Sequence, residues 1–183
     1  MISAAPDPQN TLLSPSTDAL VQDVAALLLE QHWLLATAES CTGGMVAAAC
    51  TDLAGSSQWF ERGFVTYSNA AKTQMLGVDA SLIAAHGAVS QPVAHAMAAG
   101  AQQQAGVQVS VATTGIAGPT GGSASKPVGL VWFGWGLPDG IRTEQQVFSG
   151  NRAEVRQAAT QHALQRLREY LQSSRSTANG FHA

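Results

Sequence analysis

A hydroxyl and a thiol lie side by side at Ser40 and Cys41, within residues 37–44, between an apolar run and a run of small residues. This pattern predicts a strand, a tight polar turn and a helix. A side chain in such a turn lies at a helix N-terminus, where unpaired N–H groups favour negative charge. Ser40 is therefore a candidate nucleophile, and Gly43 and Gly44 would let backbone amides approach a substrate closely. The alternative reading of Ser40 is a helix cap.

A serine nucleophile needs a base, and no histidine lies near Ser40 in the sequence. Lys72, one of two lysines, follows Tyr67 just after a predicted strand. A lysine serves as a base only if its pKa, ordinarily ~10.4, is lowered by burial or by nearby positive charge. Lys72 is thus a candidate base, and Tyr67 a candidate to relay the proton or to orient Lys72. The alternatives are a solvated lysine and an ordinary tyrosine at a strand end.

Two further segments could bind an anion. The glycine-rich loop 113–122 offers hydroxyl and amide donors, although it matches neither the Walker pattern nor GxGxxG, and Lys126 closes it. Arg152 and Arg156 lie four residues apart at the start of the last predicted helix, a spacing that suits a phosphate clamp. A generic glycine loop, a surface lysine and a solvated helix face are the alternatives.

Cysteine and histidine chemistry is less well supported by the sequence. Cys41 is an alternative nucleophile without a histidine partner nearby, and a small buried core residue is the favoured interpretation. The five histidines show neither HxH nor HExxH spacing, so no metal is expected.

Helical and strand patterns alternate along the chain. Helices are predicted near 16–31, after the Ser40 turn, and near 70–76, 79–85, 90–105 and 151–173, with strands near 33–38, 58–67, 107–112, 127–135 and 141–148. The last two strands form a hairpin, which requires an antiparallel pair. The prediction is an α/β protein, a three-layer α/β/α sandwich on a mixed sheet of about five strands. We expect one domain over 16–173, with flexible tails at 1–15 and 174–183.

The composition limits the kinds of partner that the protein is expected to bind. The 183 residues are 45% hydrophobic and 11% charged, with a formal net charge of −3. A basic footprint for nucleic acid is absent, and the low charge content favours a homo-oligomer. Since no apolar run approaches the ~20 residues that span a bilayer, no membrane association is expected. No signal-peptide pattern is visible, so the expected location is the cytoplasm.

Four motifs in order resemble the C-terminal domain family of CinA over roughly residues 16–172. They lie at residues 38–44, at Tyr67 to Asn69 with Lys72, at 114–122, and at 126–129. The stand-alone members of this family hydrolyse the carboxamide of nicotinamide mononucleotide to nicotinate mononucleotide and ammonia, in pyridine-nucleotide salvage. The larger CinA proteins carry an additional N-terminal domain linked to pyrophosphatase activity, which this chain is too short to contain.

The resemblance implies a Ser-Lys acyl-enzyme mechanism without cofactor or metal. Ser40 would be the nucleophile, Lys72 its base and Tyr67 an assistant, with amides of residues 40–44 stabilising the oxyanion. The residues implied to bind the small-molecule nucleotide substrate are Thr42, Gly43, Gly44, Thr114, Gly115, Gly118 and Arg152. The alternative is a non-catalytic pyridine-nucleotide-binding module in a competence or stress pathway.

Overall fold

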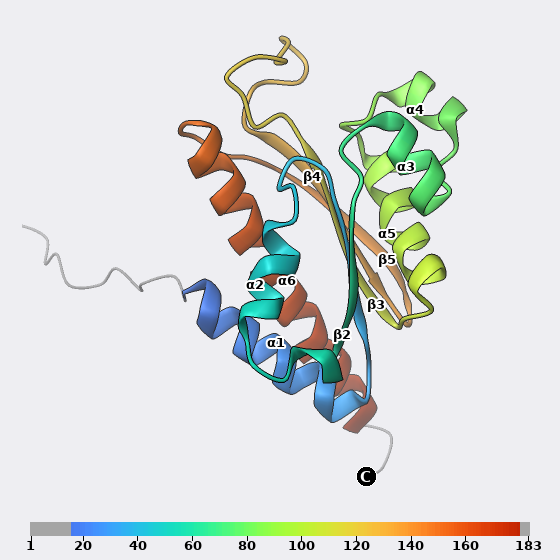
Figure 1. The fold of residues 1–183 in the computed structure, drawn as a ribbon, viewed down its shortest axis with the longest axis vertical. Coiled ribbons are helices and arrows are strands. Elements are labelled where there is room, and N and C mark those ends of the chain that lie inside the picture. Colours follow the sequence, from blue (N-terminus) through green and yellow to red (C-terminus); the bar gives the residue numbers. More distant parts are fainter. Residues whose placement is uncertain (1–15, 180–183) are drawn as a thin grey trace, which may run out of the picture.

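The computed structural model describes residues 16–179 and contains, within them, a mixed sheet of five strands (Figure 1). The strands are β1 (Leu35–Glu39), β2 (Phe60–Val65), β3 (Val109–Gly115), β4 (Leu130–Leu137) and β5 (Gly140–Val147). Their order across the sheet is β2-β1-β3-β4-β5. Strand β1 is parallel to β2 and β3, whereas β4 is antiparallel to β3 and β5. The predicted mixed sheet and its late hairpin are confirmed.

Helices cover both faces of the sheet, which completes the expected three layers (Figure 1). One face carries α1 (Thr17–Gln31), α2 (Met45–Asp52) and α6 (Arg152–Asn179). The other carries α3 (Asn69–Leu76), α4 (Ala80–His86) and α5 (Gln91–Ala105). A short 3₁₀ turn, η1 (Ser56–Gln58), precedes β2. None of the described helices is long and apolar enough to cross a membrane.

Local capping explains where the helices start and stop. The Ser16 hydroxyl accepts a hydrogen bond from the N–H of Ala19 at 3.2 Å, and Ser68 does the same for Ala71 at 3.0 Å, so α1 and α3 begin where the sequence predicts. Gly77 ends α3 in the left-handed conformation, with φ of 70°, which a residue with a Cβ adopts only at a cost.

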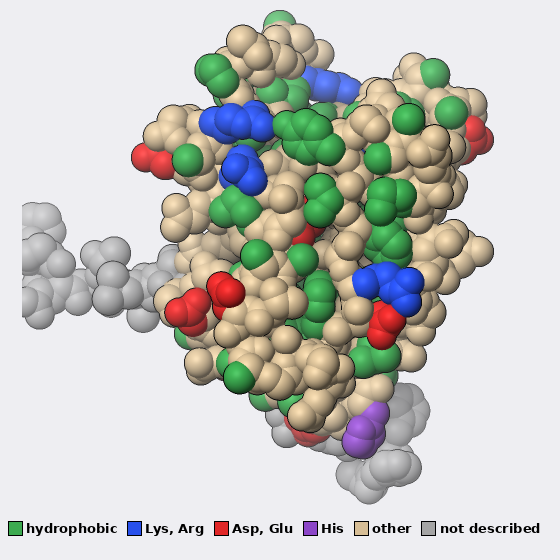
Figure 2. Space-filling view, viewed as in Figure 1, with side chains coloured by type: hydrophobic (Ala, Val, Ile, Leu, Met, Phe, Trp, Pro, Cys, Tyr) green, Lys and Arg blue, Asp and Glu red, His purple; other side chains and the backbone are tan. Residues whose placement is uncertain are grey.

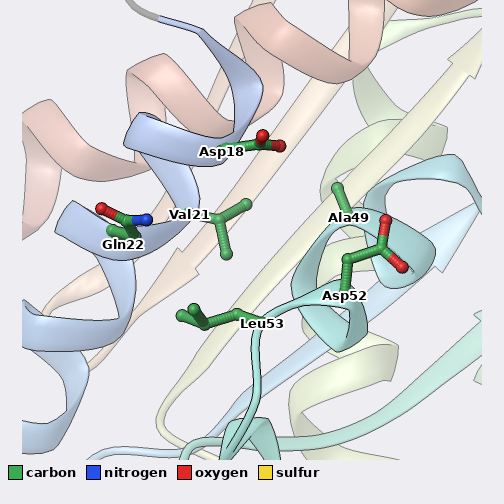
Figure 3. Close-up of a pocket in the computed structure, with 6 residues that line it drawn as sticks. All are labelled: Asp18, Val21, Gln22, Ala49, Asp52 and Leu53. Atoms are coloured by element: carbon green, nitrogen blue, oxygen red, sulfur yellow. The ribbon is translucent and has the colours of Figure 1, made fainter.

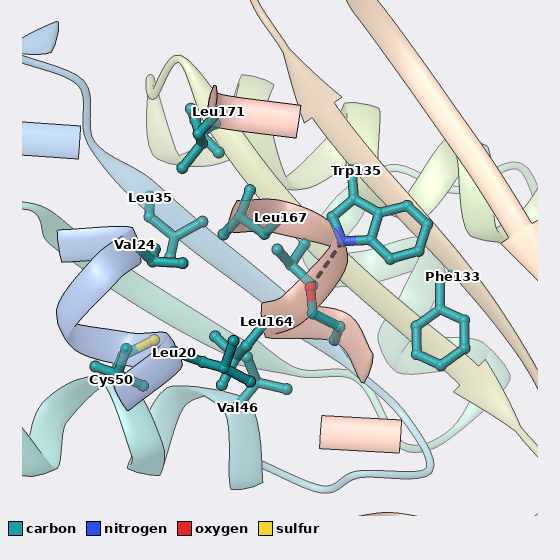
Figure 4. Packing of buried hydrophobic residues seen from close by; sticks show 14 of the residues in the cluster. Leu20, Val24, Leu35, Val46, Cys50, Phe133, Trp135, Leu164, Leu167 and Leu171 are labelled. Carbon is teal, nitrogen blue, oxygen red and sulfur yellow. Dashed lines mark hydrogen bonds between the residues drawn. The ribbon is translucent and has the colours of Figure 1, made fainter. Parts of the chain in front are cut away.

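Most of the apolar core lies between the sheet and α1, α2 and α6 (Figure 4). Trp135 of β4 is fully buried there, and its indole Nε1 donates to the carbonyl of Ala163 in α6 at 3.0 Å. The ring is buried while its N–H keeps a hydrogen-bond acceptor, and this bond joins the sheet to α6. A smaller cluster lies under α5, where a Cβ on Gly134 would come within 2.5 Å of the Ala94 carbonyl. Glycine at this position therefore allows α5 to pack closely on β4.

The last helix is longer than the sequence predicts. Helix α6 continues to Asn179, beyond residue 173, so part of the expected C-terminal tail is helical. Residues 174–179 contain neither glycine nor proline, the residues that most disfavour a helix. The predicted tail at 1–15 and its counterpart at 180–183 lie outside the described residues.

The parallel strands position the candidate residues. Because β1, β2 and β3 run in the same direction, their carboxyl ends meet at one edge of the sheet, the upper edge in Figure 1. Ser40 follows β1 directly, Tyr67 follows β2, and the glycine-rich loop follows β3. Three motifs that are distant in sequence therefore converge, as is usual for sites in open α/β sheets.

Candidate active site

Ser40 is held at the end of β1 by the neighbouring strand. Its N–H donates to the carbonyl of Thr113 at the end of β3 at 2.9 Å, which continues the parallel ladder by one residue. The Ser40 side chain is 8% exposed and lines a cavity of about 210 Å³. The backbone of Ser40 is therefore fixed, and the residue lines a small hollow.

Lys72 reaches Ser40 from the first turn of α3. Its Nζ donates to Ser40 Oγ at 3.0 Å and to the carbonyl of Thr66 at 2.9 Å. The side chain is 1% exposed, and burial lowers the pKa of Lys72 below its ordinary value of 10.5. Among the residues whose side chains are described, no carboxylate forms an ion pair with Lys72. The surroundings thus favour a neutral amine beside the hydroxyl.

Tyr67 lines the same cavity but is 61% exposed. Its hydroxyl accepts a hydrogen bond from Arg152 Nη2 at 2.9 Å, and no hydrogen bond to Lys72 is present in the described part of the chain. The phenol therefore borders the cavity mouth together with Arg152. Its expected part in proton transfer stays a prediction.

The two arginines of α6 lie in different environments. Arg152 Nη1 donates to the carbonyl of Gly118 at 2.8 Å, and this arginine borders both the Ser40 cavity and an adjoining hollow of about 680 Å³. Arg156 donates from Nε to the carbonyl of Cys41 at 3.1 Å and from Nη2 to that of Thr42 at 2.9 Å. In Figure 2, Lys and Arg side chains gather over the start of α6 on this face. Both arginines line the larger hollow, but of the two only Arg152 lines the Ser40 cavity.

Glu39 was missed by sequence reasoning, although it directly precedes Ser40. Its fully buried carboxylate accepts hydrogen bonds from the Thr42 hydroxyl at 2.7 Å and from three amides at 2.8–3.0 Å, namely those of Gly44, Val46 and Ala47. A carboxylate at a helix N-terminus accepts hydrogen bonds from the unpaired N–H groups, and its negative charge is stabilised by the positive end of the helix dipole. An acidic residue at the end of an otherwise apolar strand, just before a helix, was the available signal.

Several side chains expected to hold substrate are engaged within the protein. The Thr42 hydroxyl also lies 2.7 Å from that of Thr113, and the Thr114 hydroxyl donates to the carbonyl of Ala88 at 2.9 Å. Lys126 donates to the carbonyl of His86 at 2.9 Å. Thr114 and Gly115 still line the cavity. These threonines order the loops around the cavity.

The two cysteines are buried thiols. Burial raises the pKa of Cys41 to about 11 and that of Cys50 to about 12, so both remain protonated near neutral pH. Because the thiolate is the reactive form, Cys41 is a poor nucleophile beside the hydroxyl of Ser40.

A separate hollow of about 280 Å³ lies between α1 and α2 and contains two exposed carboxylates, those of Asp18 and Asp52 (Figure 3). It holds none of the candidate residues. Among the described residues, no group of three or more His, Cys, Asp or Glu side chains is arranged to bind a metal ion.

Comparison with known families places these features in context. A model of the CinA C-terminal domain matches residues 17–171. The nicotinamide-nucleotide amidohydrolase PncC of Enterobacter agglomerans is 53% identical over 153 residues, 82% of this chain and 93% of that protein. PncC of Escherichia coli K12 is 52% identical, covering 85% of this chain and 95% of the relative. A longer CinA-like protein of Mycolicibacterium gilvum is 56% identical, but the match spans only 36% of its length.

Solved structures have the same fold. The competence/damage inducible protein CihA of Agrobacterium tumefaciens matches with a TM-score of 0.82 and 41% identity over 87% of this chain and 98% of that one. A CinA superfamily protein of Klebsiella pneumoniae matches with a TM-score of 0.83 and 38% identity over 87% and 99% of the two chains.

Proposed function

This chain belongs to the CinA C-terminal domain family and is an amidohydrolase, and we propose that it hydrolyses the carboxamide of nicotinamide mononucleotide in pyridine-nucleotide salvage. The products are nicotinate mononucleotide and ammonia. The observation that carries the proposal is the 3.0 Å contact between Lys72 Nζ and Ser40 Oγ in a cavity bordered by Arg152. The proposal takes Ser40 as the nucleophile, Lys72 as its base and Arg152 as the cation that binds the phosphate.

In the first half of the reaction, neutral Lys72 accepts the Ser40 proton while Oγ forms a bond to the amide carbon. The carbonyl π bond opens and leaves negative charge on the oxygen. When the tetrahedral intermediate collapses, the C–N bond breaks and Lys72 returns the proton to the leaving nitrogen as ammonia. Ser40 then carries the acyl group as an ester.

In the second half, a water molecule attacks the ester carbon, and Lys72 accepts its proton. The bond between carbon and Ser40 Oγ breaks, and Lys72 protonates the departing Oγ. The product is the carboxylic acid, which ionises at neutral pH. The proposed chemistry uses no cofactor or metal, because the protein's own groups handle every proton.

The phosphate of the substrate is assigned to Arg152. Its guanidinium is exposed where the two hollows meet. It can exchange its hydrogen bonds with Tyr67 and Gly118 for charge-assisted hydrogen bonds to a phosphate. The smaller cavity, about 210 Å³, suits the pyridine carboxamide, and the ribose phosphate then extends past Arg152 into the larger hollow.

Ammonia release from three substrates tests the proposal: nicotinamide, its riboside and its mononucleotide. We expect turnover of the mononucleotide by the wild type and its loss in Ser40→Ala and in Lys72→Ala. Retained activity in either variant would contradict the assignment. Saturable binding of the mononucleotide without ammonia release would instead support the non-catalytic binding module.

A further inference from the structure

Most amides around the nucleophile are unavailable to a substrate. The backbone N–H groups that already donate within the protein are those of Ser40, Gly43, Gly44, Met45, Val46 and Ala47. In the described part of the chain, the N–H groups of Cys41 and Thr42 make no backbone–backbone hydrogen bond, although both act on the Cys41 thiol and lower its pKa. Cys41 lines the Ser40 cavity, whereas Thr42 is fully buried and does not. Glu39 therefore removes the first turn of α2 from the candidates for an oxyanion site and leaves the N–H of Cys41, in the peptide that directly follows Ser40.

Arg156 binds the main chain of this turn through carbonyl groups. Its guanidinium binds the carbonyls of Cys41 and Thr42 at 3.1 and 2.9 Å, across more than a hundred residues of sequence. In a trans peptide the C=O and N–H bonds point in opposite directions, so fixing the Cys41 carbonyl directs the Thr42 N–H away from the arginine. A Cβ on Gly43 would lie 3.3 Å from Arg156 Nη2, so the guanidinium packs directly on the turn.

Two charges of opposite sign thus fix the turn. The Glu39 carboxylate binds the amides at the start of α2, and the Arg156 guanidinium binds the carbonyls before them. Both contacts rigidify the main chain around Cys41, which directly follows Ser40 and lines the cavity. Donors fixed in place before reaction stabilise developing charge without a reorganisation cost.

Building on the proposed function, we propose that Arg156 is a positioning residue for an oxyanion site at the N–H of Cys41. The guanidinium touches neither substrate nor reacting atoms in this role. It fixes the carbonyl of Cys41, and thereby the residue whose N–H is to face the oxygen of the tetrahedral intermediate. This assignment separates Arg156 from Arg152, whose proposed role is phosphate binding.

The test uses an activated ester that carries no phosphate. Ser40 Oγ attacks the carbonyl carbon of p-nitrophenyl acetate, the ester C–O bond breaks and p-nitrophenolate leaves, while the Ser40 proton passes to Lys72. The rate of the first burst reports acylation of Ser40, and Ser40→Ala supplies the blank. The variants are Arg156→Gln and Arg156→Lys, and Arg168→Gln is the control because Arg168 lies on the same helix and binds Asp23 of α1.

We expect Arg156→Gln to slow the burst about a hundredfold, as for loss of one oxyanion-hole donor, with Arg156→Lys in between. Arg168→Gln should acylate at the wild-type rate. With nicotinamide mononucleotide, kcat should fall by a similar factor while KM changes less than about threefold, because ground-state binding is retained. A loss of stability alone would not produce this division between kcat and KM.

Other results would overturn the inference about Arg156, the proposed function, or both. An undiminished burst in Arg156→Gln, a loss matched by Arg168→Gln, or a defect confined to the phosphorylated substrate would overturn the inference. A wild type with a Ser40-dependent burst but no ammonia release from any nicotinamide derivative would overturn the proposed function and leave the role of Arg156 standing. The lack of a Ser40-dependent burst in the wild type would overturn both.

Discussion

Lys72 Nζ lies 3.0 Å from Ser40 Oγ although 32 residues separate the two in sequence. Parallel pairing of β1 and β2 places the ends of both strands at one edge of the sheet, and the capped start of α3 directs the lysine back toward β1. Lys72 as a whole is 1% exposed, so the positive form of its amine is poorly solvated. This contact supports a base that is neutral closer to physiological pH than an ordinary lysine.

The pH dependence of acylation follows from the lowered pKa of Lys72. Only the neutral amine accepts the serine proton, so the rate should rise with pH and level off once the amine is deprotonated. Because burial lowers this pKa, the midpoint of the rise should lie below 10.5. Single-turnover rates across a pH series measure it, and a rate that is flat or falling over this limb would count against Lys72 as the base.

Lys72→Met should reduce acylation by about 10²–10⁴-fold, the usual contribution of a general base. It also removes a group that the unfolded chain protonates more readily than the folded one. Wild-type stability should therefore rise with pH from the folded pKa of Lys72 toward 10.5, a slope that the variant lacks. Denaturant unfolding of both proteins at several pH values measures the difference. A stability difference between the two that is independent of pH would contradict a lowered pKa.

Arg152→Gln should raise KM for nicotinamide mononucleotide about tenfold to a hundredfold, the range for one lost charged hydrogen bond. Hydrolysis of the riboside, which has no phosphate, should change little. Tyr67→Phe is the matched control, since it removes the hydroxyl that Arg152 contacts and keeps the arginine. Equal losses on the two substrates would show that Arg152 acts through the shape of the site.

Glu39→Gln should destabilise the fold by about 2–4 kcal/mol. The amide offers one acceptor oxygen where the carboxylate binds four donors, and its NH₂ group would face backbone N–H groups. Glu61→Gln serves as the control, because Glu61 is an exposed partner of Arg62 and should cost below about 0.5 kcal/mol. Chemical denaturation compares the two, and similar losses would contradict the capping role of Glu39.

Hydrophobic periodicity and turn residues were sufficient to predict the fold class. The late hairpin predicted the antiparallel side of the sheet, and the predicted helices near 16–31 and 70–76 correspond to α1 and α3. The end of α6 was not predicted, because Ser, Arg and Thr residues after 173 are weak helix formers rather than helix breakers. The expected homo-oligomer stays a prediction.

The sequence indicated candidate residues for the site but not the distances between them. Motifs at strand ends marked Ser40 and Lys72 as candidates, but the distance between their side chains depends on strand order, which local patterns do not encode. The spacing of Arg152 and Arg156 did not separate their roles, and the family resemblance implied Arg152 as a substrate-binding residue. In the structure Arg156 binds the main chain of the nucleophile turn, whereas Arg152 lines the Ser40 cavity.

The most direct measurement is the identity of the acylated residue. Wild-type protein mixed with nicotinamide mononucleotide, quenched in acid within milliseconds and digested, should yield a peptide acylated on Ser40. Cys41→Ala should give the same adduct with unchanged burst kinetics, and Ser40→Ala should give none. An adduct on Cys41, or full ammonia release by Ser40→Ala, would contradict the Ser-Lys acyl-enzyme account.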